Sequence, residues 1–347
     1  MSAKVNEAIE WYTEKRLLYK SLAIKVESLL REILDSKSIN YYSVTSRAKE
    51  IDSYKRKALQ ESYKEPRSEI MDMAGIRVIT YTQSDAVKVS NLVKELFDVI
   101  PAHSTDKSLE LGTDRVGYRS IHFIATLGKS RERLPENQIF SGMWFEIQVR
   151  TILQHAWAEF EHDRNYKFAG VLPSDIKRRV SVLAGSLELI DTEFDRISKE
   201  IDGYAASVDS KTQSGDLNVL LDSTSLVTYL NRRFSSLVGK GVEPSLRGGD
   251  NLIMAELHAM GIKTLQDLDK IIPGSYVEIK SRFLDKNASD TYVGILRDFM
   301  IIYDAEGYFA EAWNHHWDRM TRKDADALRS FGVDVDKCAN VYEFDVD

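Results

Sequence analysis

The chain has 347 residues, of which 43% are hydrophobic and 29% charged, and its 54 acidic and 47 basic side chains give a formal net charge of −7. This composition is typical of a globular protein of about two domains and excludes a fibre, a repeat array and a disordered chain. The single cysteine, Cys338, excludes an internal disulfide and a metal site built from cysteines. No apolar run reaches the ~18 residues of a membrane helix, and the N-terminus lacks the apolar core of a signal peptide, so we expect a cytoplasmic protein without a membrane partner.

The first two hundred residues alternate between helical and strand patterns. Apolar residues at steps of three and four predict helices, and strict alternation predicts strands. In chain order, the expected elements are a helix at 3–35, a strand at 41–49, a helix at 51–63, a strand at 76–81, a helix at 84–97 capped by Ser84, strands at 119–127 and 143–150, and a helix at 151–167. We therefore expect an α/β (α+β) fold, with a mixed β-sheet flanked by helices.

The strand at 143–150 has the clearest pattern, because Phe145 and Ile147 point to one face while Glu146 and Gln148 point to the other. One face packs and the other is free for chemistry. After Pro173, apolar residues at steps of three and four predict a long helix that reaches 201. Its length suits either a helix that packs across the sheet or a helix that forms a dimer interface.

The segment 203–218 is small and polar and has no periodicity. We expect it to be a linker between a domain at 1–202 and a smaller α+β domain at 219–347. In and beside the second domain, the patterns predict helices at 217–237 and 251–272, the latter broken at Gly261, a strand pair at 276–283 and 292–303, and a helix at 310–320.

Two carboxylates, Asp72 and Glu146, lie at strand positions among basic side chains. Two carboxylates brought together from separate strands can hold Mg²⁺ against a polyphosphate. The alternative is a pair of surface carboxylates in ion pairs with neighbours such as Arg77 and Arg150, and spacing alone favours this alternative.

A basic cluster has the residue types that bind phosphate oxygens, and an arginine plane can also stack on a purine. Its members are Ser46, Arg47, Lys49, Ser53, Lys57, Arg77, Arg115 and Arg119. The alternative is a solvated helix face. That alternative is weaker for Arg47 and Lys49, which share one face of a strand leading into a helix N-terminus, where anions are favoured.

Two further patterns are ambiguous. Gly117 frees the backbone beside Tyr118, whose ring could stack on a base, although a glycine before an aromatic residue is also common in plain hairpins. His155, Glu159 and His162 follow each other at steps of four and three on one predicted helix. This spacing suits a metal site, but a helix face satisfied by hydrogen bonds is the favoured interpretation.

Five stretches, taken together, resemble the synthetase domain of the RelA/SpoT family, which transfers pyrophosphate from ATP to a ribose 3′-hydroxyl. They are TSRAKEIDSYKRK (45–57), DMAGIRVI (72–79), GYRSIH (117–122), FEIQVRT (145–151) and HAWAEFEHDRNYK (155–167). They occur in the family's order over roughly residues 5–200. The resemblance implies a synthetase core, and the chain has no His-Asp hydrolase block before it.

The resemblance also implies a role for each site residue. ATP would be bound by Arg47, Lys49, Ser53, Lys57 and Arg77. Mg²⁺ and catalysis would fall to Asp72 and Glu146, with Glu146 orienting or deprotonating the attacking hydroxyl. The acceptor, GDP or GTP, would be bound by Tyr118, His122, Gln148 and His155, with Tyr118 stacked on the guanine.

A toxin branch of the same superfamily is similar in these residues, but it pyrophosphorylates the 3′-terminal adenosine of tRNA and so blocks translation. Some of its members carry a fused C-terminal antitoxin domain that responds to phage proteins. The segment 219–347 is therefore expected to be regulatory, antitoxin-like or oligomerising, with either a protein partner or a second copy of the chain. A basic run at 177–179 is a candidate tRNA surface or a solvated helix end. A degenerate nucleotide-binding regulator is disfavoured because both metal carboxylates are present.

Overall fold

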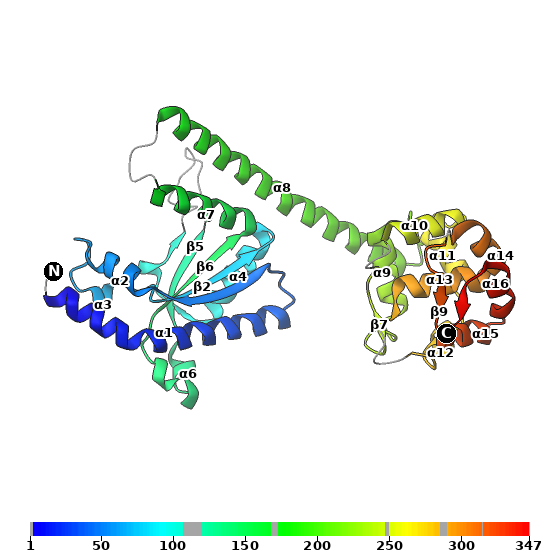
Figure 1. Ribbon diagram of the computed structural model, residues 1–347, viewed down its shortest axis with the longest axis horizontal. Coiled ribbons are helices and arrows are strands. Elements are labelled where there is room, and N and C mark those ends of the chain that lie inside the picture. The colour runs from blue at the N-terminus through cyan, green and yellow to red at the C-terminus, as the bar shows by residue number, and fades with distance from the viewer. Residues whose placement is uncertain are drawn as a thin grey trace. The chain divides into compact units, whose positions relative to one another are not determined.

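The computed structural model describes residues 3–106, 120–167, 173–246, 250–284, 290–313 and 315–346 (Figure 1). The chain divides into two compact units, Met1–Ser198 and Lys199–Asp347. Within the described ranges, no helix combines the length and the apolar character needed to cross a bilayer.

The first unit is built on a six-stranded mixed sheet, as the alternating pattern predicts. The path runs β1-β2-β6-β5-β3, and β4 also pairs with β5. β2 and β6 are parallel, whereas the other pairs are antiparallel. The strands are β1 (Ser43–Ala48), β2 (Ala74–Thr80), β3 (Asp98–Val99), β4 (Thr105–Asp106), β5 (Ile121–Thr126) and β6 (Phe145–Thr151).

Helices cover the sheet of the first unit. They are α1 (Ala3–Ser36), α2 (Ile51–Ala58), α3 (Pro66–Glu69), α4 (Gln83–Leu96), α6 (Lys129–Glu132), α7 (Ile152–Lys167) and the start of α8 (Ser174–Gln213), with 3-10 turns at Pro101–His103 and Pro135–Phe140. Apolar residues of α1 and α4 form one core with the buried side chains of β2 and β6. The other face of these strands is left for polar residues.

Two boundaries differ from the sequence predictions. The cap of α4 is Thr82 rather than Ser84, because the hydroxyl of Thr82 accepts a hydrogen bond from the backbone N–H of Asp85. The predicted linker at 203–218 is wrong for residues 203–213, since α8 continues through Gln213 and the division between the units falls inside this helix. Alanines at 205 and 206 favour helix, and Val208 is anchored in the core of the second unit.

The second unit is mostly helical. Its helices are α9 (Ser223–Arg233), α10 (Asp250–Ala259), α11 (Leu265–Ile271), α12 (Tyr276–Lys280), α13 (Tyr292–Tyr303), α14 (Ala305–Gly307), a π-helix at Tyr308–Ala312, α15 (Arg322–Ser330) and α16 (Val335–Tyr342). Its strands form two parallel pairs, β7 (Val242–Glu243) with β8 (Asp290–Thr291) and β9 (Arg319–Met320) with β10 (Asp345–Val346). The predicted break at Gly261 is confirmed, with a φ of +76°.

The predicted strand pair at 276–283 and 292–303 is wrong, because both segments contain helices. α13 is buried on several sides, with Tyr292, Leu296 and Phe299 all at 0% exposure. A helix buried all round shows a nearly continuous apolar run, and such a run does not reveal its period. The predicted helix at 310–320 is also wrong, since the π-helix ends at Ala312 and β9 begins at Arg319.

An ion cluster around the buried Lys280 joins elements of the second unit. Lys280 is 3% exposed, and its Nζ lies 2.9 Å from Asp290, 2.8 Å from Asp298 and 3.3 Å from Asp324. The Tyr276 hydroxyl donates a hydrogen bond of 2.6 Å to Asp298. Burial raises the pKa of Asp298 to about 6, although Lys280 and Tyr276 act to lower it. One ammonium group therefore compensates carboxylates from β8, α13 and α15.

Replacement of Lys280 by methionine should lower the free energy of unfolding of the second unit by about 3–5 kcal/mol, because the buried carboxylate of Asp298 loses its counter-charge. Urea denaturation measures this loss. The matched control is Lys270→Met, whose exposed ion pair with Asp267 contributes about 1 kcal/mol or less. An equal effect of the two substitutions would show that the cluster does not stabilise the unit.

Candidate active site

Three neighbouring strands bring the predicted site residues to one face of the sheet. In the register of β2 with its neighbours, Gly75 lies opposite Arg47 of β1 and Glu146 of β6, and Arg77 lies opposite Gln148. Side chains two residues apart on a strand share a face. The alternation predicted for β6 is confirmed, since Phe145 and Ile147 are buried while Glu146 and Gln148 are half-buried.

This face carries a pocket of about 130 Å³. It is lined by Thr45, Ser46, Arg47, Lys49, Asp72, Gly75, Ile76, Arg77, Glu146 and Gln148. Gly75 leaves the floor open between Arg47 and Glu146. A Cβ atom at this position would lie 3.9 Å from Arg47, which is an ordinary contact, so the protein itself leaves space for a side chain here.

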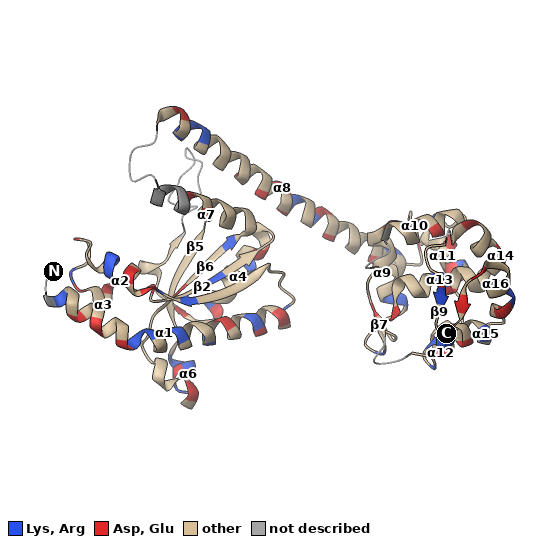
Figure 2. Cartoon of the chain, viewed as in Figure 1, with Lys and Arg blue, Asp and Glu red and all other residues tan. Residues whose placement is uncertain are grey.

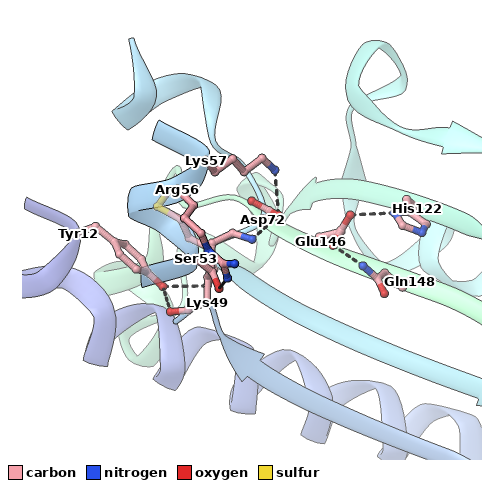
Figure 3. A network of polar contacts seen from close by, with 10 residues as sticks. Tyr12, Lys49, Ser53, Arg56, Lys57, Asp72, His122, Glu146 and Gln148 are labelled. Atoms are coloured by element: carbon pink, nitrogen blue, oxygen red, sulfur yellow. Dashed lines mark hydrogen bonds and ion pairs between the residues drawn. The ribbon is translucent and has the colours of Figure 1, made fainter. Parts of the chain in front are cut away.

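Asp72 is held through only one of its two oxygens. Its Oδ2 lies 2.7 Å from Nζ of Lys49 and 3.0 Å from Nζ of Lys57 (Figure 3). Burial acts to raise the pKa of this carboxyl, but the two ammonium groups outweigh it and the pKa lies below its ordinary value. Oδ1 is buried and has no hydrogen-bond partner among the described residues. An ionised carboxylate with one unused buried oxygen is therefore available to a cation.

Glu146 is oriented by two neighbours on the same face. Its Oε1 lies 2.9 Å from Nδ1 of His122, and its Oε2 accepts a hydrogen bond of 2.7 Å from Nε2 of Gln148. Burial acts to raise the pKa of Glu146, as does the charge of Asp72, but the contacts with His122 and Gln148 lower it below its ordinary value. Nε2 of His122 in turn lies 2.8 Å from Oγ of Ser120. Glu146 is thus an ionised carboxylate held in one orientation.

These two carboxylates fit Mg²⁺ only together with a further ligand. The structure, over its described ranges, contains no group of three or more His, Cys, Asp or Glu side chains that could hold a metal ion. Mg²⁺ prefers oxygen ligands and is usually bound by one or two carboxylates together with substrate phosphates. The unused oxygen of Asp72, with Glu146 lining the same pocket, matches that pattern.

The residues predicted to bind ATP differ in whether they line the pocket. Arg47 is exposed, lines the pocket and makes no ion pair with the described residues. Lys49 lines it too, whereas Lys57 reaches Asp72 from α2. Ser53, one turn before Lys57, is not a lining residue, and its hydroxyl accepts a hydrogen bond from Arg56.

The favoured ion pair between Arg77 and one of the two carboxylates is wrong. Arg77 instead contacts Glu159 of α7, with 3.1 Å between Nη1 and Oε1. His155 Nδ1 lies 3.6 Å from the same oxygen, and burial together with the charge of Arg77 lowers the pKa of its imidazole. Glu159 was not predicted to belong to the site, although its step of four from His155 was visible in the sequence.

Several predicted residues cannot be placed. Tyr118, Arg115 and Arg119 lie outside the described residues, and so does the side chain of His162. The basic run at 177–179 lies in the first turns of α8 and is exposed.

A residue far away in the sequence positions Lys49. Tyr12 of α1 is fully buried, and its hydroxyl donates a hydrogen bond of 2.6 Å to the carbonyl of Lys49. Its ring stacks on Tyr54 with 4.4 Å between centroids. The N–H of Lys49 donates to the carbonyl of Met73 at 2.9 Å, which fixes the lysine beside Asp72. Tyr12 was missed because, in the sequence, it is one more apolar position of a packing helix.

Comparison with known proteins gives consistent matches. Residues 46–170 match the family described as "Region found in RelA / SpoT proteins". GTP pyrophosphokinase YjbM of Bacillus subtilis is 28% identical over 177 residues, covering 50% of this chain and 79% of that protein. GTP pyrophosphokinase YwaC of the same organism is 30% identical over 153 residues, covering 44% and 69%. Among solved structures, small alarmone synthetase 1 from Bacillus subtilis has a TM-score of 0.47 and 24% identity, covering 56% of this chain and 98% of its own.

Removal of the Tyr12 hydroxyl in Tyr12→Phe should destabilise the first unit by about 1 kcal/mol, because the carbonyl of Lys49 loses the shorter of its two side-chain hydrogen bonds while the ring stacking is kept. Urea denaturation measures the change. Tyr42→Phe is the control, since Tyr42 is 54% exposed and its hydroxyl makes no hydrogen bond with the described residues, so we expect no change. A Tyr12→Phe protein as stable as the wild type contradicts this role.

Proposed function

We propose that this chain, which belongs to the RelA/SpoT family of pyrophosphotransferases, transfers the pyrophosphate group of ATP to the ribose 3′-hydroxyl of GDP or GTP. The product would be an alarmone of the (p)ppGpp type, and we propose no hydrolase activity. Two relatives of the chain are named GTP pyrophosphokinases. The observation that carries the proposal is the pair of ionised carboxylates, Asp72 and Glu146, at a pocket whose other charged lining residues are cationic.

The charges around the pocket suit a nucleoside triphosphate. Arg47, Lys49 and Arg77 line it, and Lys57 reaches Asp72 from α2. Asp72 and Glu146 would hold Mg²⁺. When it is bound, Mg²⁺ neutralises part of the phosphate charge. Lys49 and Lys57 would then be shared between Asp72 and the phosphates, since an ammonium group offers three donors.

The chemistry requires little covalent work from the protein. The 3′-oxygen of the acceptor forms a bond to the β-phosphorus of ATP, and the bond from that phosphorus to the oxygen of the α-phosphate breaks to release AMP. The proton of the 3′-hydroxyl passes to Glu146, whose contact with His122 fixes the direction of its carboxylate. Gln148 and His155 would contact the acceptor, and Tyr118 would stack on its base.

A second candidate is transfer to the 3′-terminal adenosine of tRNA, with the second unit acting as an antitoxin-like domain or binding a regulatory protein. The observation in its favour is the basic run Lys177, Arg178 and Arg179 in the first turns of α8 (Figure 2). All three side chains are exposed and make no ion pair with the described residues. Unpaired cations are suited to a nucleic-acid backbone, but they also occur at solvated helix ends.

The deciding experiment incubates the purified chain with Mg²⁺, ATP labelled at the γ-phosphate, and one acceptor at a time: GDP, GTP or deacylated tRNA. We expect the label on GDP or GTP. Label on tRNA alone would establish the second candidate and overturn the first. Label on no acceptor, with ATP bound, would overturn both.

Asp72→Asn and Glu146→Gln should each lower the rate of pyrophosphate transfer at least ~100-fold, because each removes a carboxylate from the reacting centre. Initial rates at saturating ATP measure the effect. The control is Glu95→Gln, which removes a surface carboxylate that pairs with Lys37. Full activity of either site variant would place the reaction elsewhere.

Replacement of Gly75 by valine should weaken nucleotide binding at least ~10-fold while leaving the fold intact. The new side chain fills the pocket floor but has room beside Arg47, and valine suits a strand. Calorimetry with a non-hydrolysable ATP analogue measures affinity, and thermal melting checks the fold. Gly203→Val, at an open position of α8, is the control. Unchanged affinity in the Gly75 variant would mean that the nucleotide does not occupy this floor.

A further inference from the structure

Helix α8 carries an apolar stripe with a constant repeat. Its apolar residues follow each other at strictly alternating steps of three and four: Val180, Leu183, Leu187, Ile190, Phe194, Ile197, Ile201, Tyr204 and Val208. The mean step is 3.5 residues, which is the repeat of a left-handed coiled coil rather than the 3.6 of a straight helix packed on a core. At 1.5 Å per residue the stripe extends over about 42 Å.

Most of this stripe is not covered. Leu183, Ile190, Phe194, Ile197, Ile201 and Tyr204 have exposed fractions between 40 and 52%. Val208, at the end of the stripe, is buried in the core of the second unit. Half-exposed apolar residues are common singly, but a regular row of them along one helix indicates a contact surface.

The first unit contacts a different face of α8. Ala184 and Asp191 are buried there, and Oδ2 of Asp191 accepts hydrogen bonds from Gln83 at 3.1 Å and Gln154 at 3.3 Å. Asp195 accepts one of 2.7 Å from the backbone N–H of Ser84. Ala184 and Asp191 occupy the heptad position next to the stripe, and Asp195 lies one position farther round the helix. The stripe itself therefore does not serve to hold α8 on the sheet.

We propose that the stripe of α8, from Val180 to Tyr204, forms a parallel two-stranded coiled coil with the same helix of a second copy of this chain. A stripe with apolar residues at both core positions of every heptad is complementary to itself, and a pair related by a two-fold axis uses one surface twice. The area that eight apolar side chains and the residues beside them would bury is close to the roughly 800 Å² per partner of a specific interface. Packing of Ala184 and Asp191 on the first unit blocks the position that a third or fourth strand would need.

Charge selects the parallel direction. The acidic residues Glu193 and Glu200 flank the core on one side, and Ser198 and Ala205 flank it on the other. In a parallel pair each glutamate faces one of these uncharged residues of the other helix. An antiparallel pair would place glutamates opposite each other, which is unfavourable.

The oligomeric state of the full chain tests the proposal. Sedimentation velocity at micromolar concentration should give twice the mass of the chain, and Ile190→Lys should give a monomer. The control is Leu189→Lys, because Leu189 is the more exposed neighbour at 72% but lies outside the stripe. It should remain a dimer. Both variants should keep the circular dichroism of their folded units, because Ile190 is half-exposed and Leu189 is largely exposed.

A monomeric wild-type chain would overturn the proposal, as would a dimer that Leu189→Lys dissociates and Ile190→Lys does not. Oxidative cross-linking tests the direction. Ile201→Cys adds a thiol to a chain whose own Cys338 is buried, and a parallel pair brings the two copies of residue 201 together. Disulfide-linked dimer is expected, and a non-covalent dimer that does not cross-link would overturn the parallel arrangement.

Discussion

The site depends on a carboxylate that is neutralised from one side only. One oxygen of Asp72 contacts two ammonium groups, and the other is buried without a partner among the described residues. A buried carboxylate without counter-charge costs several kcal/mol, so Lys49 and Lys57 make this position tolerable before any ligand arrives. The oxygen that remains is suited to a hard cation. The open floor at Gly75 and the oriented Glu146 then define where a polyphosphate would lie.

Much of the site could be predicted from the sequence because its residues lie in local patterns. The alternation in β6 separates Glu146 and Gln148 from the core, and the strand leading into α2 places Arg47 and Lys49 together. The contacts made by Tyr12 and Glu159 could not be predicted, because each joins residues far apart in the chain. Their own surroundings look like an ordinary packing helix and an ordinary helix face.

The wrong predictions of secondary structure in the second unit have a different cause. A short fully buried helix and a buried strand both appear as an uninterrupted apolar run, so α13 could not be told from a strand by its period. The prediction for residues 203–213 was wrong for another reason: small and polar residues surround Tyr204 and Val208 and hide the continuation of the helix that begins at Ser174. Lys280 and its three carboxylates, which tie the unit together, come from separate elements that no local pattern connects.

The most direct test of the central claim is the binding of a divalent cation with and without nucleotide. Mn²⁺ can replace Mg²⁺ and is followed by electron paramagnetic resonance. Two carboxylates alone should bind Mn²⁺ weakly, and a non-hydrolysable ATP analogue should strengthen binding because its phosphates complete the ligand set. Asp72→Asn and Glu146→Gln should each remove this gain. Tight nucleotide-dependent binding that survives in both variants would contradict the account.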